Sequence, residues 1–559
     1  MKNIKRYSIL LFFALIFTLV GCQDDFLNTK IDTSSTQEII NSSNSSFFRF
    51  AVTPYTFLRY EFFVIDNNLF DVITDDAETT STNASARNFT LGSWNAFQNP
   101  DNYYSTYYSA IRSANYFLEI ADNYKTILGS NRDTISASGK VSYAQDTINA
   151  KWYRAEAHIA RAYYYFELLK RYGGVPLVTS TLKITDNTNI ARSSFDDVAN
   201  FIVSEINNNV DQLQLNWRSS TYVGNDGRFS QGSAMALKSR VLLYAASPLH
   251  NSTNDVQKWQ TALLAAADVI NLKQYSLEPK AAFTNYFLLN TTLTSKETIW
   301  AIRNAEDNSL EKNNYPIGTP GGNSGVCPSH NLVSDFEYIG TPNATNPYLK
   351  RDPRLSQYVV TQGSTWNNRI MDNTTGGIDD MSKSNTSKTG YYLKKFLNPN
   401  LDLLNNQTVV HNWVVFRYAE ILLNYAEAMN ELYGPDNNPN GLSLTAKQAL
   451  NLVRTRSDLA NVTTSDLNTF RIAVKHERRI ELAFENHRYW DLLRWKDAEI
   501  VLNQPVQGVS VTKNADGTYS YQVRNVGTRI FDANKMYYYP IPQSEISKSN
   551  GVLVQNPNW

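Results

Sequence analysis

The chain has 559 residues, several times the ~100–150 residues of an average domain, so it is long enough to bury a large core. Hydrophobic residues make up 42% of the chain and charged residues 19%, which excludes a disordered or fibrous protein. Lysine plus arginine equals aspartate plus glutamate at 52 each, so no net charge attracts nucleic acid, and that class of partner is disfavoured. Tyrosine is abundant at 34 residues, which indicates rings that pack together or face a ligand.

The first 21 residues have the pattern of a secretory signal peptide. Basic residues at positions 2, 5 and 6 precede an uncharged stretch, Ser8–Val20, that is shorter than the ~20 residues needed to cross a bilayer. Gly21 and Cys22 follow, and the junction resembles a bacterial lipobox, in which cleavage leaves Cys22 to carry lipid such as palmitate. An ordinary signal peptide with an incidental cysteine is the alternative. Because no other stretch is long and apolar enough to cross a membrane, we expect acyl chains on Cys22 to anchor the mature protein.

The sequence after the signal peptide predicts a mainly α-helical fold built from helix pairs. Between Lys151 and Arg171, apolar residues recur every three or four positions, and two glycines at 173–174 end the predicted helix. Similar stripes predict helices near residues 234–247, 259–270, 417–432 and 446–456. Small and aromatic residues alternate along these stripes, which is similar to tetratricopeptide packing with dispersed rather than tandem repeats. We therefore predict a tetratricopeptide-like superhelix with long loop-rich insertions and few short strands.

Two long loop-rich segments, Asp66–Asn102 and Thr284–Asn412, interrupt the predicted helix pairs. Loops of this length in a compact protein usually carry function. After the signal peptide at 1–21, we expect a first region at 22–229, with the first helix pairs and the first loop. A second region at 230–559 would hold the remaining pairs and the second loop.

Five segments, in order along the chain, match one known family. They are RAEAHIARAYYYFELLKRYGGVPLV (154–178), ALKSRVLLYAASPL (236–249), FRYAEILLNYAEA (416–428), HERRIELAFENHRYWDLLRWKDAE (476–499) and YPIPQSEI (539–546), with VQNPNW as the tail. Together with the lipobox, these segments resemble the SusD/RagB outer-membrane lipoproteins along the whole chain. The family usually has Gly where this chain has Asn486, and Asn is the next residue to tolerate a left-handed conformation at a helix end.

The resemblance implies a non-enzymatic role at the cell surface, without a cofactor. SusD-like proteins bind an oligosaccharide and cap a TonB-dependent β-barrel transporter of the SusC type, and RagB-like relatives do the same for peptides. The resemblance also implies that the helical repeats face the transporter. Asp24 and Asp25, close behind Cys22, resemble the surface-export signal of Bacteroidetes lipoproteins. This implies a lipid anchor in the outer membrane, with the protein facing the cell exterior.

Three carboxylates in the fourth motif share one predicted helix face, namely Glu477, Glu481 and Glu485. Paired carboxylates can serve as the acid and base of a glycoside hydrolase, which is the enzymatic alternative. Arg478 and Arg488 each lie three residues from one of these carboxylates, and acids alternating with bases on a helix are typical of ion pairs. We therefore interpret the carboxylates as a partly buried ion-pair network between helices rather than a catalytic site.

Other chemical motifs are weak or incomplete. The segment RDPRL (351–355) has the same ion-pair interpretation as the carboxylate helix. The six histidines show no metal-ligand spacing, and the one His-Glu pair, His476-Glu477, lacks the second histidine of a zinc helix. Asp436–Gly441 copies the start of a calcium loop, but Lys447 stands where the bidentate glutamate is needed. We expect a turn there, and no metal site.

A sugar site needs exposed aromatic rings with Asp, Asn or Arg beside them, because sugars offer C–H faces and hydroxyls. In the first loop, Asp75, Asp76 and Arg87 precede Trp94 and Asn95. No helical stripe surrounds this tryptophan to explain its burial, and the resemblance implies that early loops carry the binding tryptophan. We predict that Trp94, Asp76 and Asn95 bind glycan; packing of the ring in the core is the alternative.

The second loop supplies further candidates for the same site. Gly318–Val333 is rich in glycine, whose backbone can approach a ligand closely, and we expect it to bring Cys327 and His330 to the surface. Further along, Arg369 lies in a polar stretch and Tyr391 follows a glycine. We predict that Cys327, Arg369 and Tyr391 contribute to the glycan site.

Overall fold

A computed structural model describes residues 40–559, except 83–84, 184, 188, 219–223 and 289. The predicted signal peptide and Cys22 lie outside the described residues, so lipidation stays a prediction. Within the described ranges, no helix combines the length and the apolar composition that a membrane span requires.

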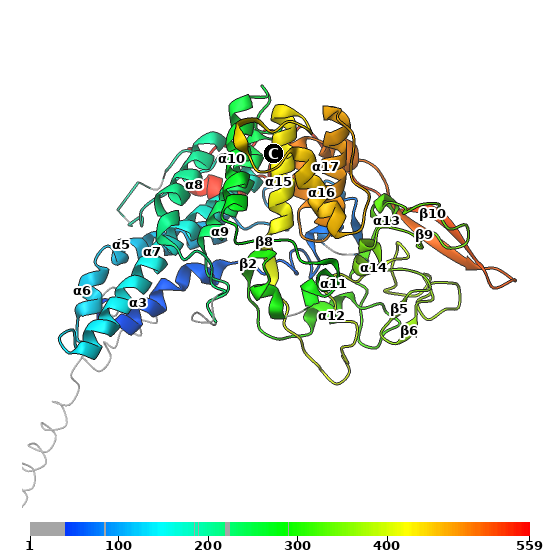
Figure 1. Cartoon of the computed structure of the whole chain (residues 1–559), viewed down its shortest axis with the longest axis horizontal. Coiled ribbons are helices and arrows are strands. Elements are labelled where there is room, and N and C mark those ends of the chain that lie inside the picture. Colours follow the sequence, from blue (N-terminus) through cyan, green and yellow to red (C-terminus); the bar gives the residue numbers. More distant parts are fainter. Residues whose placement is uncertain (1–39, 83–84, 184, 188, 219–223, 289) are drawn as a thin grey trace, which may run out of the picture.

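Long helices form a row that runs through the molecule (Figure 1). In chain order they are α3 (Asn44–Ala51), α5 (Tyr104–Ala121), α7 (Ala137–Tyr172), α8 (Phe195–Asn209), α9 (Gln231–Ala246), α10 (Val256–Asn271), α15 (Tyr418–Tyr433), α16 (Ala446–Arg456) and α17 (Leu467–Glu481). Each packs on its neighbour: α5 on α7, α7 on α8, α8 on α9, α9 on α10, α10 on α15, and α15 on α16 and α17. The predicted mainly α, tetratricopeptide-like fold is confirmed.

The predicted helix boundaries hold to within a few residues, with one exception. The helix predicted from Lys151 belongs to α7, which begins at Ala137, where the Ser136 side chain accepts a hydrogen bond from the Gly139 amide. The first half of α7 is largely exposed, with Val141 72% accessible, so no buried stripe marks it in the sequence. Its C-terminal end is as predicted, because Gly173 adopts a positive φ of 71°.

Short strands form small sheets, some of which join segments that are far apart in the sequence. The described part of the chain contains five two-stranded antiparallel sheets: β1 (Ala77–Thr79) with β3 (Val326–Pro328), β2 (Thr298–Ile302) with β8 (Trp413–Arg417), β4 (Val359–Val360) with β7 (Tyr392–Leu393), β5 (Thr365–Trp366) with β6 (Arg369–Ile370), and β9 (Val506–Lys513) with β10 (Tyr519–Gly527). The β9–β10 hairpin projects from the loop-rich half at the end opposite α3 and α6 (Tyr124–Gly129) (Figure 1). The strands therefore define a loop-rich half beside the helix row.

A buried ion-pair network joins the helix row to the loop-rich half. Glu481 of α17 pairs with Arg354 at 2.8 Å, Arg417 at 2.6 Å and Arg456 at 2.5 Å, and its side chain is fully buried. Glu485 pairs with Arg417 at 2.7 Å. The ion-pair interpretation of the carboxylate helix and of RDPRL, which contributes Arg354, is confirmed, although the network is fully rather than partly buried.

The partners within the carboxylate segment differ from the local pairs expected. Arg478 pairs with Asp491 at 2.7 Å, and Arg488 pairs with Asp75 of the first loop at 2.9 Å. The expected tolerance at Asn486 is confirmed, since this residue adopts a φ of 59°. Its side-chain Oδ1 also accepts a hydrogen bond from the Phe70 amide at 3.0 Å.

The calcium-like segment is a turn between α15 and α16, as predicted. Pro439–Gly441 forms one short 3₁₀ turn, and the Asp436 carboxylate accepts a hydrogen bond from Lys447 at 2.5 Å. Among the described residues, no three His, Cys, Asp or Glu side chains gather in a way that could hold a metal.

Candidate functional site

The structure places the two predicted binding loops side by side. Strand β1 of the first loop pairs with β3 of the second, with Glu78 opposite Cys327. Ser329 adds two hydrogen bonds to the first loop, from its amide to the Asp76 carbonyl at 2.8 Å and from its hydroxyl to the Asp75 carbonyl at 2.5 Å. The expectation that both loops contribute to one region therefore agrees with the arrangement of the backbone.

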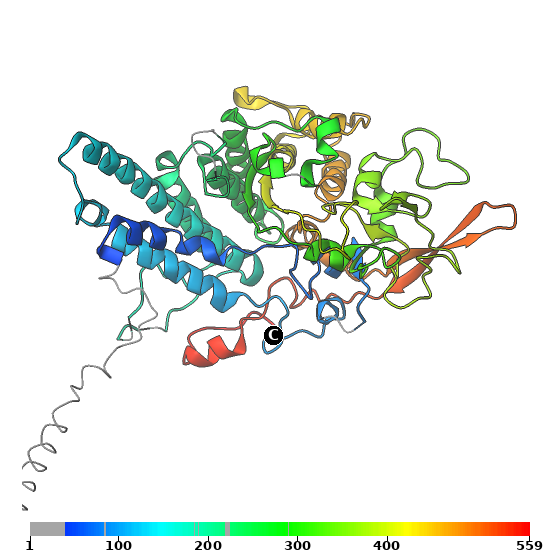
Figure 2. The same cartoon turned by 90° about the horizontal axis from the view of Figure 1, so that it is seen from below.

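The prediction that Trp94 exposes a ring face is wrong. Trp94 is 2% accessible and packs against Phe89 at 4.4 Å between ring centroids, Trp559 at 4.5 Å and Tyr539 at 5.0 Å. The C-terminal segment that supplies two of these rings lies beside the first loop and α5, as the view from below shows (Figure 2). The core alternative for this ring is correct. Asn95 is exposed, but its Oδ1 accepts hydrogen bonds from two backbone amides of the same turn.

Asp76 is buried and acts within the fold. Its carboxylate accepts a hydrogen bond from Arg479 of α17 at 2.8 Å, and the adjacent Asp75 pairs with both Arg479 and Arg488. Burial alone would raise the pKa of Asp75, but the two guanidinium groups hold it well below its ordinary value. These aspartates anchor the first loop to the helix row, and both are buried, so neither presents its carboxylate to a ligand.

Cys327 and Arg369 are also held by the protein itself. The prediction that the second loop brings Cys327 to the surface is wrong: the thiol is fully buried, and burial raises its pKa to about 12. Arg369 forms a two-pronged pair with Asp379 at 2.5 and 2.7 Å. Both residues therefore shape the loop rather than present a reactive or charged group.

Tyr391 leads to a different surface group, which we call the tyrosine–histidine cluster. It comprises His330 of α13 (His330–Asp335), Tyr338, Tyr348, Arg351, Tyr391 and Tyr521 of β10. Tyr391 is buried at its centre, whereas His330, Tyr348 and Tyr521 are half-buried and Tyr338 is exposed. The ring centroids of Tyr348 and Tyr521 are 5.5 Å apart with their planes nearly perpendicular.

The polar atoms of the cluster form a directed chain. The Tyr348 hydroxyl donates to the Tyr391 hydroxyl at 3.4 Å, and the Tyr391 hydroxyl lies 2.9 Å from His330 Nδ1. Tyr391 accepts from Tyr348 and keeps its own proton to donate; in the tautomer in which Nδ1 accepts that proton, the imidazole N–H lies at Nε2. No described residue accepts a hydrogen bond from that Nε2.

The cluster carries little available charge. Burial, together with the nearby Arg351, lowers the pKa of His330, so the imidazole is neutral at neutral pH. Arg351 donates to four backbone carbonyls, those of Val333, Ser334, Phe336 and Pro347. Its guanidinium also lies 4.2 Å from the ring centroid of Tyr338 and so supports that exposed ring.

The arrangement suits a ligand that has both apolar faces and hydroxyl groups. The exposed ring of Tyr338 and the half-buried rings of Tyr348 and Tyr521 offer stacking surfaces, and the imidazole N–H offers a donor. Tyr391 is the predicted site residue that lies in this cluster, where it is buried and contacts His330 and Tyr348, while sequence reasoning missed Tyr338, Tyr348 and Tyr521. An available signal was their position in polar segments without a helical stripe, the same signal that was used for Trp94.

Two family models match the chain. Residues 296–559 match the SusD family, and residues 25–243 match a family described as starch-binding and associating with the outer membrane. The chain belongs to the SusD family. The five motifs that indicated this family are therefore supported by matches over most of the sequence.

Individual relatives agree with the family assignment. SusD-like protein P2 of Formosa agariphila is 24% identical, over 99% of this chain and the whole relative. A SusD-like protein of Bacteroides fragilis has a solved structure that is 25% identical, with a TM-score of 0.75 over 95% of this chain and 99% of that one. A laminarin-binding SusD-like protein shares the fold, with a TM-score of 0.64, 21% identity and coverage of 93% of this chain and 100% of that one.

Proposed function

We propose that this chain binds oligosaccharide at the tyrosine–histidine cluster, without catalysing a reaction. The observation that carries the proposal is the exposed ring of Tyr338 with the half-buried rings of Tyr348 and Tyr521 beside a neutral imidazole donor, on a chain of the SusD family. The laminarin-binding structural neighbour supports the carbohydrate ligand class and suggests a β-glucan as the first ligand to test.

The chemistry of the cluster favours a sugar over a peptide. Arg351 donates four hydrogen bonds to the protein backbone. The lowered pKa of His330 leaves its imidazole uncharged at neutral pH. Arg351 keeps its positive charge but is only 9% accessible, so the exposed part of the cluster consists of ring faces and hydroxyls, which match the hydroxyl groups and C–H faces of a sugar ring. Peptide binding of the RagB kind is the alternative that the experiment below separates.

The carboxylates that suggested a hydrolase are unsuited to catalysis. Glu477 and Glu481 are fully buried and Glu485 is 7% accessible, and each is held by arginine side chains. A glycosidase needs two carboxyl groups that reach opposite sides of a scissile bond. The buried network offers no such access, which supports a binding role.

We further propose that a lipid on Cys22 anchors the protein in the outer membrane facing the exterior, where it caps a SusC-like TonB-dependent transporter. The family description that mentions the outer membrane supports this placement. Palmitate labelling of the natural chain but not of Cys22→Ser would support the anchor. Native purification in mild detergent should recover the chain with a large β-barrel protein, and repeated isolation as a monomer would contradict the partnership.

Binding to the cluster can be tested by calorimetric titration with laminarin, starch and a peptide digest. Tyr348→Ala removes a half-buried ring, and we expect affinity for the bound glycan to fall about ten- to hundredfold, or about 1–3 kcal/mol. Phe97→Ala is the control, because Phe97 is an exposed aromatic ring of the first loop outside the cluster. Equal losses in the two variants, or binding of peptides alone, would overturn the proposal.

A further inference from the structure

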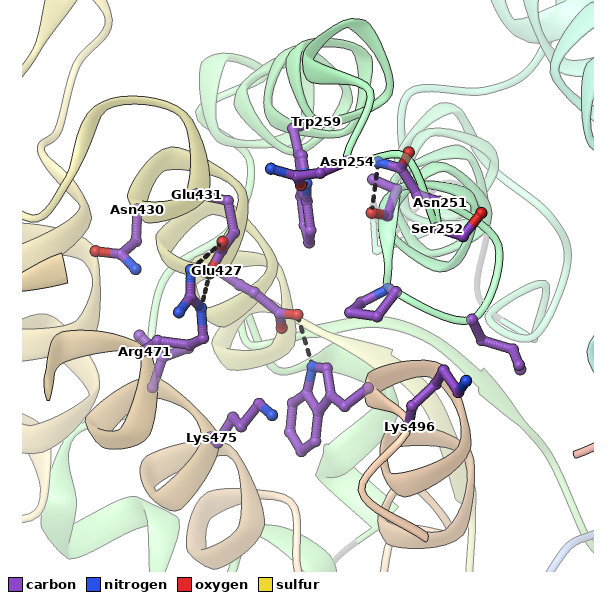
Figure 3. A pocket seen from close by; sticks show the side chains of 15 residues that line it. Asn251, Ser252, Asn254, Trp259, Glu427, Asn430, Glu431, Arg471, Lys475 and Lys496 are labelled. Carbon is purple, nitrogen blue, oxygen red and sulfur yellow. Dashed lines mark hydrogen bonds and ion pairs between the residues drawn. The ribbon is translucent and has the colours of Figure 1, made fainter. Parts of the chain in front are cut away.

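Two apolar surfaces of the helix row differ in how much of them a partner can reach. The first lines a cavity of about 600 Å³ between α10, α15 and α17 (Figure 3). Its indole rings, Trp259 and Trp495, are only 4% and 6% accessible, so the protein itself covers most of their surface. The second surface lies on the first half of α7, where the apolar side chains are exposed.

A stripe of apolar side chains runs along the exposed face of α7. Because its members recur at intervals of four, three and four residues, they lie on one face of the helix. Val141 is 72% and Ile148 is 43% accessible, and Ile135, just before the helix, is 83% accessible. We call this surface the α7 stripe; it comprises Ala137, Val141, Ala144 and Ile148, all exposed.

The opposite face of the same part of α7 packs inside the protein. Ala150 is buried there and joins Ile127 of α6 in a small core cluster. Further along α7 the exposed face is covered as well, since Trp152 packs against Trp217 with ring centroids 5.5 Å apart. The α7 stripe therefore continues a packing surface beyond the residues that cover it.

The charge beside the α7 stripe is positive. Lys140 and Lys151 flank it on one side, both are exposed, and neither pairs with a carboxylate in the described part of the chain. Asp146 of the same helix already pairs with Arg132 at 2.6 Å, and Asp133, just before the helix, carries a single opposing charge. Apolar side chains with lysines beside them are typical of a helix that lies on a membrane with anionic headgroups.

The α7 stripe lies at the end of the helix row where the described chain enters the fold. There α3, α6 and the start of α7 lie together, opposite the β9–β10 hairpin (Figure 1). Ile40 belongs to the same core cluster as Ile127, and the Ser42 carbonyl accepts a hydrogen bond from Asn131 at 3.3 Å. Ile40 follows Cys22 by 18 positions, a span of at most ~65 Å. A lipid on Cys22 therefore attaches to this end of the helix row and not to the hairpin end.

We propose that the α7 stripe rests on a lipid surface with anionic headgroups, namely the membrane to which the chain is anchored. Val141 and Ile148 reach the boundary between headgroups and acyl chains, and Lys140 and Lys151 contact the phosphate groups. The inference rests on the proposed lipid on Cys22 and adds a second contact, which fixes the orientation of the helix row on the membrane.

The test places an environment-sensitive dye on the α7 stripe of the lipidated full chain, in vesicles of phosphatidylethanolamine and phosphatidylglycerol. Val141→Cys supplies the attachment point, because lipid blocks Cys22 and the Cys327 thiol is fully buried. Spin-labelled lipid should quench the dye at Val141→Cys about threefold more strongly than at Leu404→Cys. Leu404 is the matched control, because it is an apolar residue of similar accessibility, 70%, that lies in the second loop.

A charge-reversing variant tests the contribution of the lysines. Lys140→Glu combined with Lys151→Glu should lower the quenching at Val141→Cys about twofold in these vesicles and leave it unchanged in vesicles of neutral phosphatidylcholine. Thermal melts of all variants check folding.

Sedimentation with the vesicles separates this inference from the proposed anchor. If the lipidated chain sediments and Cys22→Ser does not, the anchor stands, and equal quenching at Val141→Cys and Leu404→Cys then overturns the stripe contact alone. A lipidated chain that stays in the supernatant contradicts both. A dye at Val141→Cys that the barrel partner shields from spin-labelled lipid and from aqueous iodide alike would show a protein contact, which also overturns the inference.

Discussion

The helix row and the loop-rich half differ in how far apart their contacts lie in the sequence. In the row, α7, α8, α9 and α10 pack on one another in chain order, so local periodicity already contains the information about packing. In the loop-rich half, β1 pairs with β3 from a distant segment, and Trp94 packs against rings of the C-terminal segment. Local patterns are therefore informative about the first region and misleading about the second.

The buried ion-pair network is where the two regions depend on each other. Arg354 of α14 (Arg354–Tyr358) in the loop-rich half and Arg456 of the helix row both bond to Glu481. Removing one partner of a buried pair leaves charges without compensation in a medium of low polarity. Substitutions here should affect both regions at once, whereas substitutions in an exposed loop should affect neither.

The largest effect is expected for Glu481→Gln. Three arginines would lose a shared carboxylate in a fully buried position, so we expect the free energy of unfolding to fall by about 3–5 kcal/mol. Urea denaturation followed by circular dichroism measures this loss. Glu545→Gln is the control, because its partner Lys548 is largely exposed, and it should cost about 1 kcal/mol or less. Comparable small losses in both variants would show that the network does not hold the two regions together.

Trp94→Ala tests the corrected placement of the first loop. Removing a buried indole that packs against three other rings should cost about 3–5 kcal/mol of stability. The affinity of the remaining folded protein for glycan should be unchanged, as measured by calorimetry at a temperature well below the melting transition. Phe97→Ala, in the same loop but 80% accessible, should change stability by about 0.5 kcal/mol or less. Lost glycan affinity with an unchanged melting temperature in Trp94→Ala would restore the original assignment.

The sequence was sufficient for the helix row because each helix carries its own stripe and its own end signals, as Gly173 shows at the end of α7. It was insufficient for Trp94, since the rings that cover it, Tyr539 and Trp559, come from the opposite end of the chain. The prediction that Asp76 binds glycan was wrong for the same reason, because its partner Arg479 lies on the distant helix α17.

The sequence also predicted the candidate site only in part. Tyr391 was selected for its position after a glycine, yet its contacts with His330 and Tyr348 arise from three segments that meet only in the folded chain. The tyrosine content indicated rings that pack or bind, but no local pattern separates the exposed Tyr338 from the buried Tyr391. Whether a tyrosine ring is exposed to a ligand depends on tertiary contacts, and the spacing of apolar residues in the sequence gives no information about them.

The smallest expected effect is a pH dependence of the stability that the ion pairs of Glu481 provide. Burial alone would raise the pKa of Glu481, but Arg456, Arg417 and Arg354 hold it below its ordinary value. The unfolded chain then binds more protons than the folded chain below the ordinary pKa of ~4.5, so the stabilisation by this carboxylate is complete at pH 7 and decreases as pH falls. At pH 4 the decrease is about 1 kcal/mol or less for one carboxylate.

This decrease is best measured as a difference between two proteins. The free energies of unfolding of the natural chain and of Glu481→Gln should differ less at pH 4 than at pH 7, by about 1 kcal/mol or less, because the glutamine cannot titrate. Taking the difference cancels the other acidic groups, among them Asp71, whose pKa burial raises to about 7 and which therefore titrates in the opposite sense. A difference that stays constant from pH 7 to pH 4 would mean that the arginines do not lower the pKa of Glu481. The ion pairs of Glu481 would then contribute little to joining the two regions.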